Sequence, residues 1–117
     1  MWLPDSQVRI WLYMHPTDMR KSFNGLSGLI RQVMEENPLS GALFIFINRR
    51  RTYIKVFYFD GSGYCIWMKR LEQGRFQMPN THEQNYKLDS TTLKLILDGI
   101  DLTSVRKRKR FQLKNSK

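Results

Sequence analysis

The side chains in this sequence that could act on another molecule are mainly cations, and they gather in two segments. Residues 49–70 hold six lysines and arginines against one acid, and residues 102–117 hold seven against none. The second segment contains an unbroken basic run: Arg106, Lys107, Arg108, Lys109 and Arg110. Such a run attracts phosphate through counterion release, which requires no fixed geometry. The chemistry that these residues favour is binding of a polyanion, above all nucleic acid.

The first segment places its cations at the ends of expected strands. A tight turn after an apolar run holds three of them, Arg49, Arg50 and Arg51, and a later strand closes on Lys69 and Arg70. Antiparallel pairing would bring both groups to the same edge of a sheet, opposite the turn at residues 60–63. Arg75 follows in the next loop and completes the predicted basic surface. The alternative is that these cations only protect strand edges from aggregation.

Lys55 is a lone cation on the aromatic face of an expected strand, between Tyr53 and Phe57. Aromatic and basic side chains on one strand face form a surface on which nucleic-acid bases can stack. A lysine at the edge of the core, with its ammonium group reaching water, explains the same pattern equally well. Tyr53 and Phe57 are also the residues that we expect to contact a protein partner, if this face remains open.

Groups that could catalyse a reaction are scattered along the chain. Asp60 is explained by a hairpin turn and Asp18 by the first turn of a helix, while His15 and His82 have no nucleophile at a recognisable spacing. Cys65 stands in an expected strand, and no run of Cys and His has the spacing of zinc ligands. A glycine-rich phosphate loop is also absent from the sequence. We therefore expect no enzyme activity, metal or cofactor.

The length and composition are those of one globular domain with an excess of positive charge. The 117 residues carry a net charge of +10, and we expect a single domain over 1–103 followed by a flexible basic tail over 104–117. One cysteine allows no internal disulfide, which favours a reducing cytoplasm. The longest apolar run, residues 42–47, is far below the roughly 20 residues that span a bilayer, so we expect no membrane association.

Hydrophobic periodicity predicts the strands. Alternation over 8–14, an apolar run over 43–47 and an aromatic run over 53–59 each predict a strand, and the last continues through an Asp-Gly hairpin into 64–68. Residues 75–78 could form a short edge strand, whereas 79–87 reads as a polar loop.

Two helices complete the expected fold. The first begins at a Thr17 N-cap, continues towards Met34 and packs Phe23, Leu26, Ile30 and Val33 on the sheet. Gly25 and Gly28 disfavour helix, so either it starts later or another backbone comes close there. A second, short helix follows an Asp89 or Ser90 cap and ends at Gly99. The fold class is α+β: an antiparallel sheet of about four or five strands, one main helix on one face, and a short C-terminal helix.

Three motifs in this order resemble a known family. They are Asp-Met-Arg-Lys-Ser-Phe-Asn-Gly-Leu at 18–26, Lys55 followed by Asp-Gly-Ser-Gly at 60–63, and Lys-Arg-Leu-Glu-Gln-Gly-Arg-Phe at 69–76. Together they look like the small accessory protein, of TnpB or Orf2 type, of the sixty-six family of bacterial insertion sequences. This family is distinct from the RNA-guided nuclease that shares the TnpB name. The resemblance implies a role in transposition beside a separate transposase that carries the catalytic acids.

Two functional hypotheses follow. In the first, the protein is a non-catalytic accessory factor that binds DNA or the transposase–DNA complex through the basic sheet edge and the basic C-terminal arm. In the second, it is an adaptor that docks on the transposase through Tyr53 and Phe57 without touching DNA. A small nuclease is the weakest alternative, because no acidic or histidine cluster is present in the sequence for metal-assisted hydrolysis.

Overall fold

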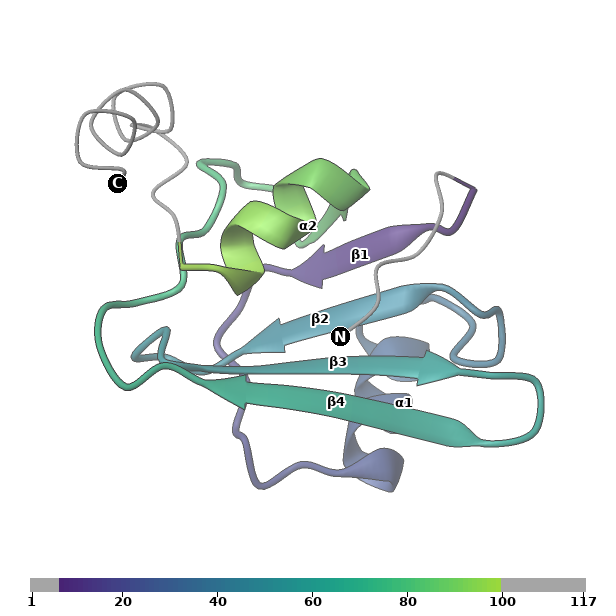
Figure 1. Ribbon diagram of the computed structural model, residues 1–117. Coiled ribbons are helices and arrows are strands. Elements are labelled where there is room, and N and C mark those ends of the chain that lie inside the picture. Colours follow the sequence, from purple (N-terminus) through teal and green to yellow (C-terminus); the bar gives the residue numbers. More distant parts are fainter. Residues whose placement is uncertain (1–6, 100–117) are drawn as a thin grey trace.

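The computed structural model describes residues 7–99, and within them five strands form one sheet between two helices (Figure 1). The expected tail at 104–117, with its cations Arg106 to Arg110, lies outside the described residues, as does the expected boundary at residue 103. The elements in chain order are β1 (Ile10–Tyr13), α1 (Phe23–Gln32), β2 (Leu43–Ile47), β3 (Tyr53–Phe59), β4 (Tyr64–Arg70), β5 (Asn85–Leu88) and α2 (Ser90–Leu97).

The strand order is β4-β3-β2-β1-β5, and all neighbouring pairs except β1 and β2 are antiparallel. This mostly antiparallel sheet confirms the expected α+β class. The parallel pair was not expected, but it follows from the position of α1 in the chain. A helix between two strands returns the chain to the end of the sheet where the first strand began, so the second strand runs in the same direction.

Both faces of the sheet are buried, one under each helix. Leu26 and Ile30 of α1 pack in one cluster with Phe44, Phe46 and Phe57. On the other face the core contains these residues of the sheet, α2 and the 71–78 loop: Ile45, Ile54, Val56, Phe76, Leu93 and Ile96. Figure 1 shows α1 behind the sheet and α2 on the near side. Apolar residues therefore alternate between two cores along β2 and β3, which explains why both strands read as continuous apolar runs.

Helix α1 begins at Phe23, six residues after the expected Thr17 cap. Thr17 is buried, and its backbone N–H donates to the Ile47 carbonyl at 3.0 Å, which ties the chain to β2 instead of starting a helix. A later start was one of the two explanations for the glycines, although Gly25 and Gly28 both remain inside the helix. A Cβ atom on Gly25 would lie 3.2 Å from the Lys21 side chain.

The inward face of α1 is narrower than expected. Leu26 and Ile30 are fully buried, as the apolar stripe predicted. Phe23 and Val33 are each 44% exposed, so their expected packing on the sheet was wrong. Met34, just beyond the helix, is buried in their place.

Strand β5 begins within the segment, 79–87, that the sequence indicated as a polar loop, and it ends one residue beyond it. Asn85–Leu88 pairs antiparallel with β1, from Tyr13 opposite Asn85 to Ile10 opposite Leu88. The proposed strand at residues 75–78 is instead irregular, although Phe76 within it is completely buried. Three of the four side chains of this edge strand are partly or fully exposed. Its alternation of apolar and polar residues is therefore too weak to distinguish it from a loop in the sequence.

The turn before β4 and the cap of α2 agree with their sequence signals. The Asp60 carboxylate accepts hydrogen bonds from the backbone N–H groups of Ser62 and Gly63, and Gly61 has a φ of 102°. Asp89 caps α2 by accepting from the Thr92 N–H at 2.6 Å. Neither helix in residues 7–99 is long and apolar enough to cross a membrane.

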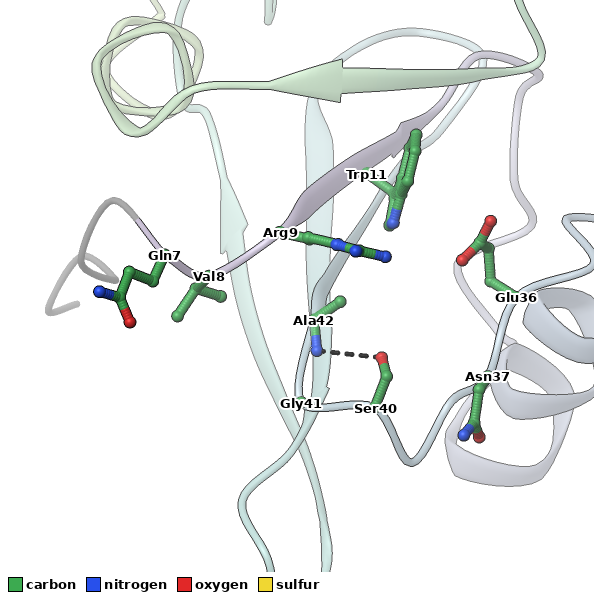
Figure 2. A pocket seen from close by; sticks show the side chains of 9 residues that line it. All are labelled: Gln7, Val8, Arg9, Trp11, Glu36, Asn37, Ser40, Gly41 and Ala42. Carbon is green, nitrogen blue, oxygen red and sulfur yellow. Dashed lines mark hydrogen bonds between the residues drawn. The ribbon is translucent and has the colours of Figure 1, made fainter.

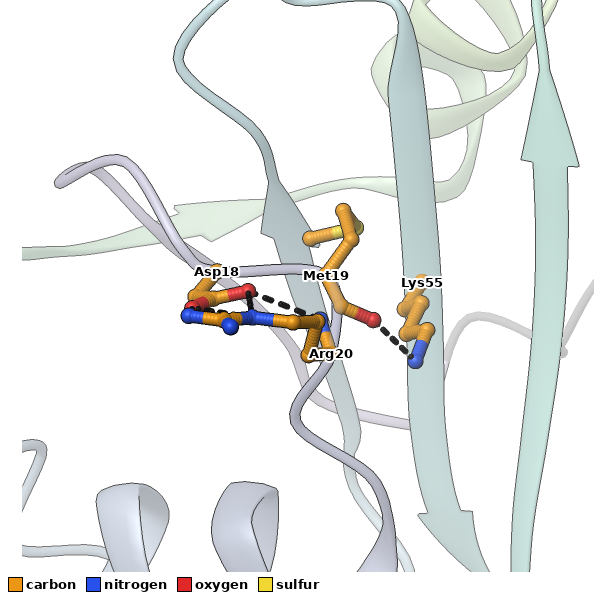
Figure 3. A network of polar contacts seen from close by, with 4 residues as sticks. All are labelled: Asp18, Met19, Arg20 and Lys55. Carbon is orange, nitrogen blue, oxygen red and sulfur yellow. Dashed lines mark hydrogen bonds and ion pairs between the residues drawn. The ribbon is translucent and has the colours of Figure 1, made fainter.

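The loop between β1 and α1 is held to β3 by a buried cation. Lys55 is 7% exposed, and its Nζ donates to the carbonyls of Met19 at 2.8 Å and Lys21 at 2.7 Å. Figure 3 shows the Lys55 side chain reaching from β3 to this loop. Hydrogen bonds from a charged donor are stronger than neutral ones, and losing the donor would leave two carbonyls without it. The Lys55 contact therefore fixes the loop on the sheet.

Replacing Lys55 by Met keeps the apolar stem but removes both hydrogen bonds to the loop. We expect Lys55→Met to lower the free energy of unfolding by about 2–4 kcal/mol, measured by urea denaturation. Lys87, exposed on β5, provides the matched control, and Lys87→Met should change stability by less than about 0.5 kcal/mol. Equal unfolding midpoints for the two variants would contradict this role of Lys55.

Candidate nucleic-acid interface

Exposed arginines from three segments meet at one end of the sheet. The turn from β2 to β3 contributes three of them, and the Tyr53–Arg70 register places the end of β4 beside that turn. The next loop is tied to the same place, because the Phe76 N–H donates to the Arg51 carbonyl at 2.6 Å. We call this surface the basic end and define it by these exposed residues: Arg49, Arg50, Arg51, Arg70 and Arg75.

The direction of the strands explains why these residues share one end. In Figure 1 the arrows of β1, β2 and β4 all point to the same side, where β3 begins. The backbone N–H of Leu71 donates to the Thr52 carbonyl at 2.8 Å and extends the β3–β4 ladder to the edge. The expectation that the arginine turn and the end of β4 are adjacent is therefore met by the backbone pairing.

The Asn48 side chain holds the arginine turn in shape. Its Oδ1 accepts hydrogen bonds from the backbone N–H groups of Thr52 at 2.9 Å and Tyr53 at 3.0 Å. Arg51 has a φ of 59°, a left-handed conformation that is uncommon for a residue with a side chain. Its N–H donates to the Asn48 carbonyl at 3.0 Å, so the turn is closed by backbone as well as side-chain contacts. The turn therefore presents its arginines from a defined backbone.

Two of the expected phosphate-binding lysines are engaged inside the protein. Lys55 is buried against the β1–α1 loop, as described above. Lys69 is half-buried on the α2 face, and its Nζ donates to the Leu97 carbonyl at 2.8 Å, at the C-terminus of α2. A cation there stabilises the negative end of the helix dipole. The burial of Lys55 contradicts its expected role, whereas the role of Lys69 stays a prediction. Because both ammonium groups donate to carbonyls of this chain, we leave both lysines out of the basic end.

The aromatic sheet face is also not the open surface that the sequence suggested. Phe57 is completely buried in the core beneath α1, and its ring centroid lies 4.9 Å from that of Tyr64. Tyr53 is half-buried at the start of β3. Phe57 cannot meet a partner from this position, which corrects its expected role in protein binding.

The β1–α1 loop adds two cations that the sequence did not single out. Arg20 and Lys21 are exposed in this loop, next to Asp18 and Met19. A hollow of about 470 Å³ is lined by both chain segments: Pro16, Thr17, Asp18, Met19, Asn48, Arg49 and Arg50. Residues 1–48 hold equal numbers of cations and acids, so the net charge of this segment did not indicate Arg20 and Lys21 as part of a basic surface. Their proximity to the basic end depends on the tertiary fold.

Two acids lie among these cations, and each pairs with an arginine. Asp18 contacts Arg20 with a closest distance of 2.7 Å, from Oδ2 to Nη2. Glu72 accepts one hydrogen bond from Arg70 at 3.1 Å, and both side chains are largely exposed. The hydrogen bonds from Arg20 lower the pKa of Asp18 from 3.8 to about 2. Arg49, Arg50, Arg51 and Arg75 make no ion pair within the described residues, so the surface remains positive.

The opposite end of the sheet has a different character. A hollow of about 400 Å³ lies there between the start of β1 and the end of α1. Figure 2 shows Arg9 and Trp11 extending from the β1 segment on the side of Glu36, so one cation and one acid share this hollow. The Ser40 hydroxyl accepts a hydrogen bond from the Ala42 N–H at 3.2 Å, and both residues line the hollow. The hollow has no excess of positive charge.

Side chains that could bind a metal ion are dispersed within residues 7–99. No group of three or more His, Cys, Asp and Glu in this part of the chain could hold a metal ion. Burial and the neighbouring Asp60 raise the pKa of the Cys65 thiol, which makes it a poor nucleophile. Its Sγ lies 3.6 Å from Asp60 Oδ2 and donates to that carboxylate.

Comparison with known proteins identifies the family. The sequence model described as IS66 Orf2 like protein matches residues 8–107, which is most of the chain. The chain belongs to this family. The resemblance drawn from its three motifs is thereby confirmed. Membership makes the chain an IS66 Orf2-like accessory protein of an insertion sequence and associates it with transposition.

Two relatives from Sinorhizobium fredii (strain NBRC 101917 / NGR234) have similar lengths. The uncharacterized protein y4hO is 39% identical over 100 residues, which cover 85% of this chain and 87% of the relative. The uncharacterized protein y4jC is 30% identical over 105 residues, which cover 90% of each chain. No solved structure matches this IS66 Orf2-like protein.

The ion pair in the β1–α1 loop predicts an unusual titration. The Asp18 carboxyl should titrate with a pKa of about 2, measured by NMR of the side-chain carbons, and Arg20→Ala should move that pKa back towards 3.8. A lowered pKa means that the pair stabilises the native state above the ordinary pKa of Asp18, and that this contribution disappears as the pH falls through the native value.

Asp60 provides the control for this titration. Contacts within its own turn lower the pKa of Asp60, so Arg20→Ala should leave that pKa unchanged. An Asp18 pKa of 3.8 in the wild-type protein would show that the ion pair does not form in solution.

Proposed function

We propose that this IS66 Orf2-like protein is a non-catalytic accessory factor that binds DNA during transposition, at transposon ends or within the transposase–DNA complex. The observation that carries the proposal is the basic end. Five exposed arginines from three segments lie there, and one acid, Glu72, pairs with one of them, Arg70. Cations held on one rigid surface attract a phosphate backbone more effectively than the same charges spread around the protein.

The shape of the basic end favours contact with a nucleic-acid backbone over a small anion. Arginines from the turn, the end of β4 and the following loop are displayed along an exposed sheet end, not gathered around one enclosed point. Arginine also matches phosphate geometry, since its planar guanidinium can donate two parallel hydrogen bonds. The arginines would position the protein on DNA, and such contacts carry no sequence information by themselves.

The basic run from Arg106 to Arg110 would serve as an arm that adds phosphate contacts. It begins nine residues after the end of α2 in the chain, so it can reach DNA bound near the same domain. Five successive cations need no fixed structure to release counterions from DNA. We assign Arg106, Lys107, Arg108, Lys109 and Arg110 this role as part of the proposal.

Docking on the transposase through the aromatic sheet face is the less favoured mode, because Phe57 is covered by α1. A partner could still contact the protein elsewhere, and charge on the basic end would then speed its association with a DNA-bound transposase. DNA binding by the isolated protein distinguishes the two modes.

The affinity for DNA should depend steeply on salt. If six or more phosphates are contacted, affinity for a labelled duplex should fall by roughly 10³ to 10⁵ between 50 and 200 mM salt. The triple variant Arg49→Ala, Arg50→Ala and Arg51→Ala should bind more weakly and reduce the slope of log affinity against log salt by about 3. Fluorescence anisotropy at several salt concentrations measures both quantities.

A second triple variant distinguishes the effect of where the cations lie from the effect of the protein's net charge. Arg9→Ala, Arg31→Ala and Lys87→Ala removes three exposed cations that lie outside the basic end, so it should weaken binding much less. An equal loss in both triple variants would show that net charge, and not the basic end, determines binding. Absence of binding by the wild-type protein, or a flat salt response, would overturn the proposed function.

A further inference from the structure

The backbone of the β1–α1 loop is anchored on both sides of Arg20. The Thr17 N–H donates to the Ile47 carbonyl at 3.0 Å, which attaches the start of the loop to β2. The Lys55 ammonium group binds the carbonyls of Met19 and Lys21, the residues directly before and after Arg20. The residue between those two carbonyls therefore has a backbone that is fixed relative to the sheet.

The side chain of Arg20 is oriented by Asp18. Its Nε lies 3.1 Å from both carboxylate oxygens of Asp18, and its Nη2 lies 2.7 Å from Oδ2. The Arg20 backbone N–H donates to the same carboxylate at 2.9 Å. Figure 3 shows one edge of the guanidinium turned to the Asp18 carboxylate, with Lys55 bound to the Met19 carbonyl of the same loop. Asp18 therefore uses one edge of the guanidinium and leaves Nη1 and the outer hydrogen of Nη2 free to donate.

This arrangement differs from the other arginines at the same end. The Arg20 side chain is 91% exposed, although it makes several contacts with its neighbour, so its outer edge faces solvent. Arg70 makes one hydrogen bond to Glu72 between two exposed side chains, and Arg49 and Arg50 have no acidic partner in the described part of the chain. Arg20 is thus the pre-organised arginine of this surface.

The charge of the Asp18–Arg20 pair determines which part of DNA Arg20 can bind, the phosphate backbone or a base edge. The pair is neutral overall, and the Asp18 carboxylate repels phosphate, so Arg20 is poorly placed to hold a DNA backbone. A base edge is uncharged, and the guanine edge in the major groove offers two adjacent acceptors, O6 and N7. A guanidinium whose orientation is fixed in advance loses little side-chain entropy on binding there.

We propose that Arg20, oriented by Asp18 and by the loop that Lys55 holds, recognises guanine through O6 and N7 in DNA bound at the basic end. This inference rests on the proposed function and adds a source of sequence preference to it. The hollow lined by Asp18, Met19, Arg49 and Arg50 places the loop beside the arginines that contact phosphate. Phosphate contacts set the position of the protein, and the neighbouring arginine reads a base.

The test uses the full chain and a pool of DNA duplexes with randomised central positions. Wild-type protein should enrich guanine at one or more positions, with a preference on the order of 5- to 150-fold over other bases. Replacing that guanine by 7-deazaguanine, which keeps base pairing but lacks N7, should remove much of the preference. Arg20→Ala, which removes the guanidinium group, should remove the preference and lower the affinity for unselected duplexes only slightly, because Arg20 is poorly placed to hold the DNA backbone.

Asp18→Asn gives the more diagnostic result. It removes one negative charge, so affinity for unselected duplexes should rise while the guanine preference falls, a combination that a purely structural role of Asp18 would not produce. Arg31→Ala, on the exposed side of α1, is the control and should leave the preference intact. Thermal unfolding establishes that each variant is folded.

Three outcomes distinguish the inference from the function on which it rests. Salt-dependent binding without base preference would overturn the reading role of Arg20 and leave the proposed function standing. A guanine preference that persists in Arg20→Ala would also overturn the role of Arg20. Absence of DNA binding would overturn both.

Discussion

The contact between Lys55 and the β1–α1 loop is the interaction on which the surface proposed to bind DNA depends. A buried ammonium group must have its hydrogen bonds satisfied, and here the carbonyls of Met19 and Lys21 provide them from 34 to 36 residues away in the chain. This requirement holds the entry to α1 against β3. It also places the short loop that carries Arg20 next to the turn between β2 and β3. A cation that the sequence indicated as a ligand-binding residue is therefore one that shapes the proposed binding surface.

The second constraint is the polarity of the sheet. Because α1 makes β1 and β2 parallel, their carboxyl ends lie together with the start of β3 and the end of β4. Loops at this end carry the exposed arginines, whereas the other end carries Asp60 and the mixed charges of Arg9 and Glu36. One helix packs on each face of the sheet. Recognition of a partner by the folded domain is thus left to its ends, edges and outer helix surfaces.

The sequence predicted those elements whose whole pattern of apolar and turn residues lies within one segment. β2 and β3 have the expected bounds because a continuous apolar run between turn residues has few alternatives. The parallel pairing of β1 and the existence of β5 depend on which strands meet in space, so periodicity did not indicate them. The internal partners of Lys55 and Lys69 were missed for the same reason, since the carbonyls that bind their ammonium groups come from distant segments. The adjacency of Arg51 and Arg70 was predictable because hairpin pairing alone determines it.

The most direct measurement is a map of the backbone amide NMR shifts of the full chain as a short DNA duplex is added. Binding at the basic end predicts that the largest changes fall in residues 18–21, 48–51 and 70–76. The turn at 60–63 and the hollow beside Glu36 should change little. Shifts centred on that opposite end, or no shifts at low salt, would contradict a DNA-binding surface at the carboxyl ends of β1 and β2.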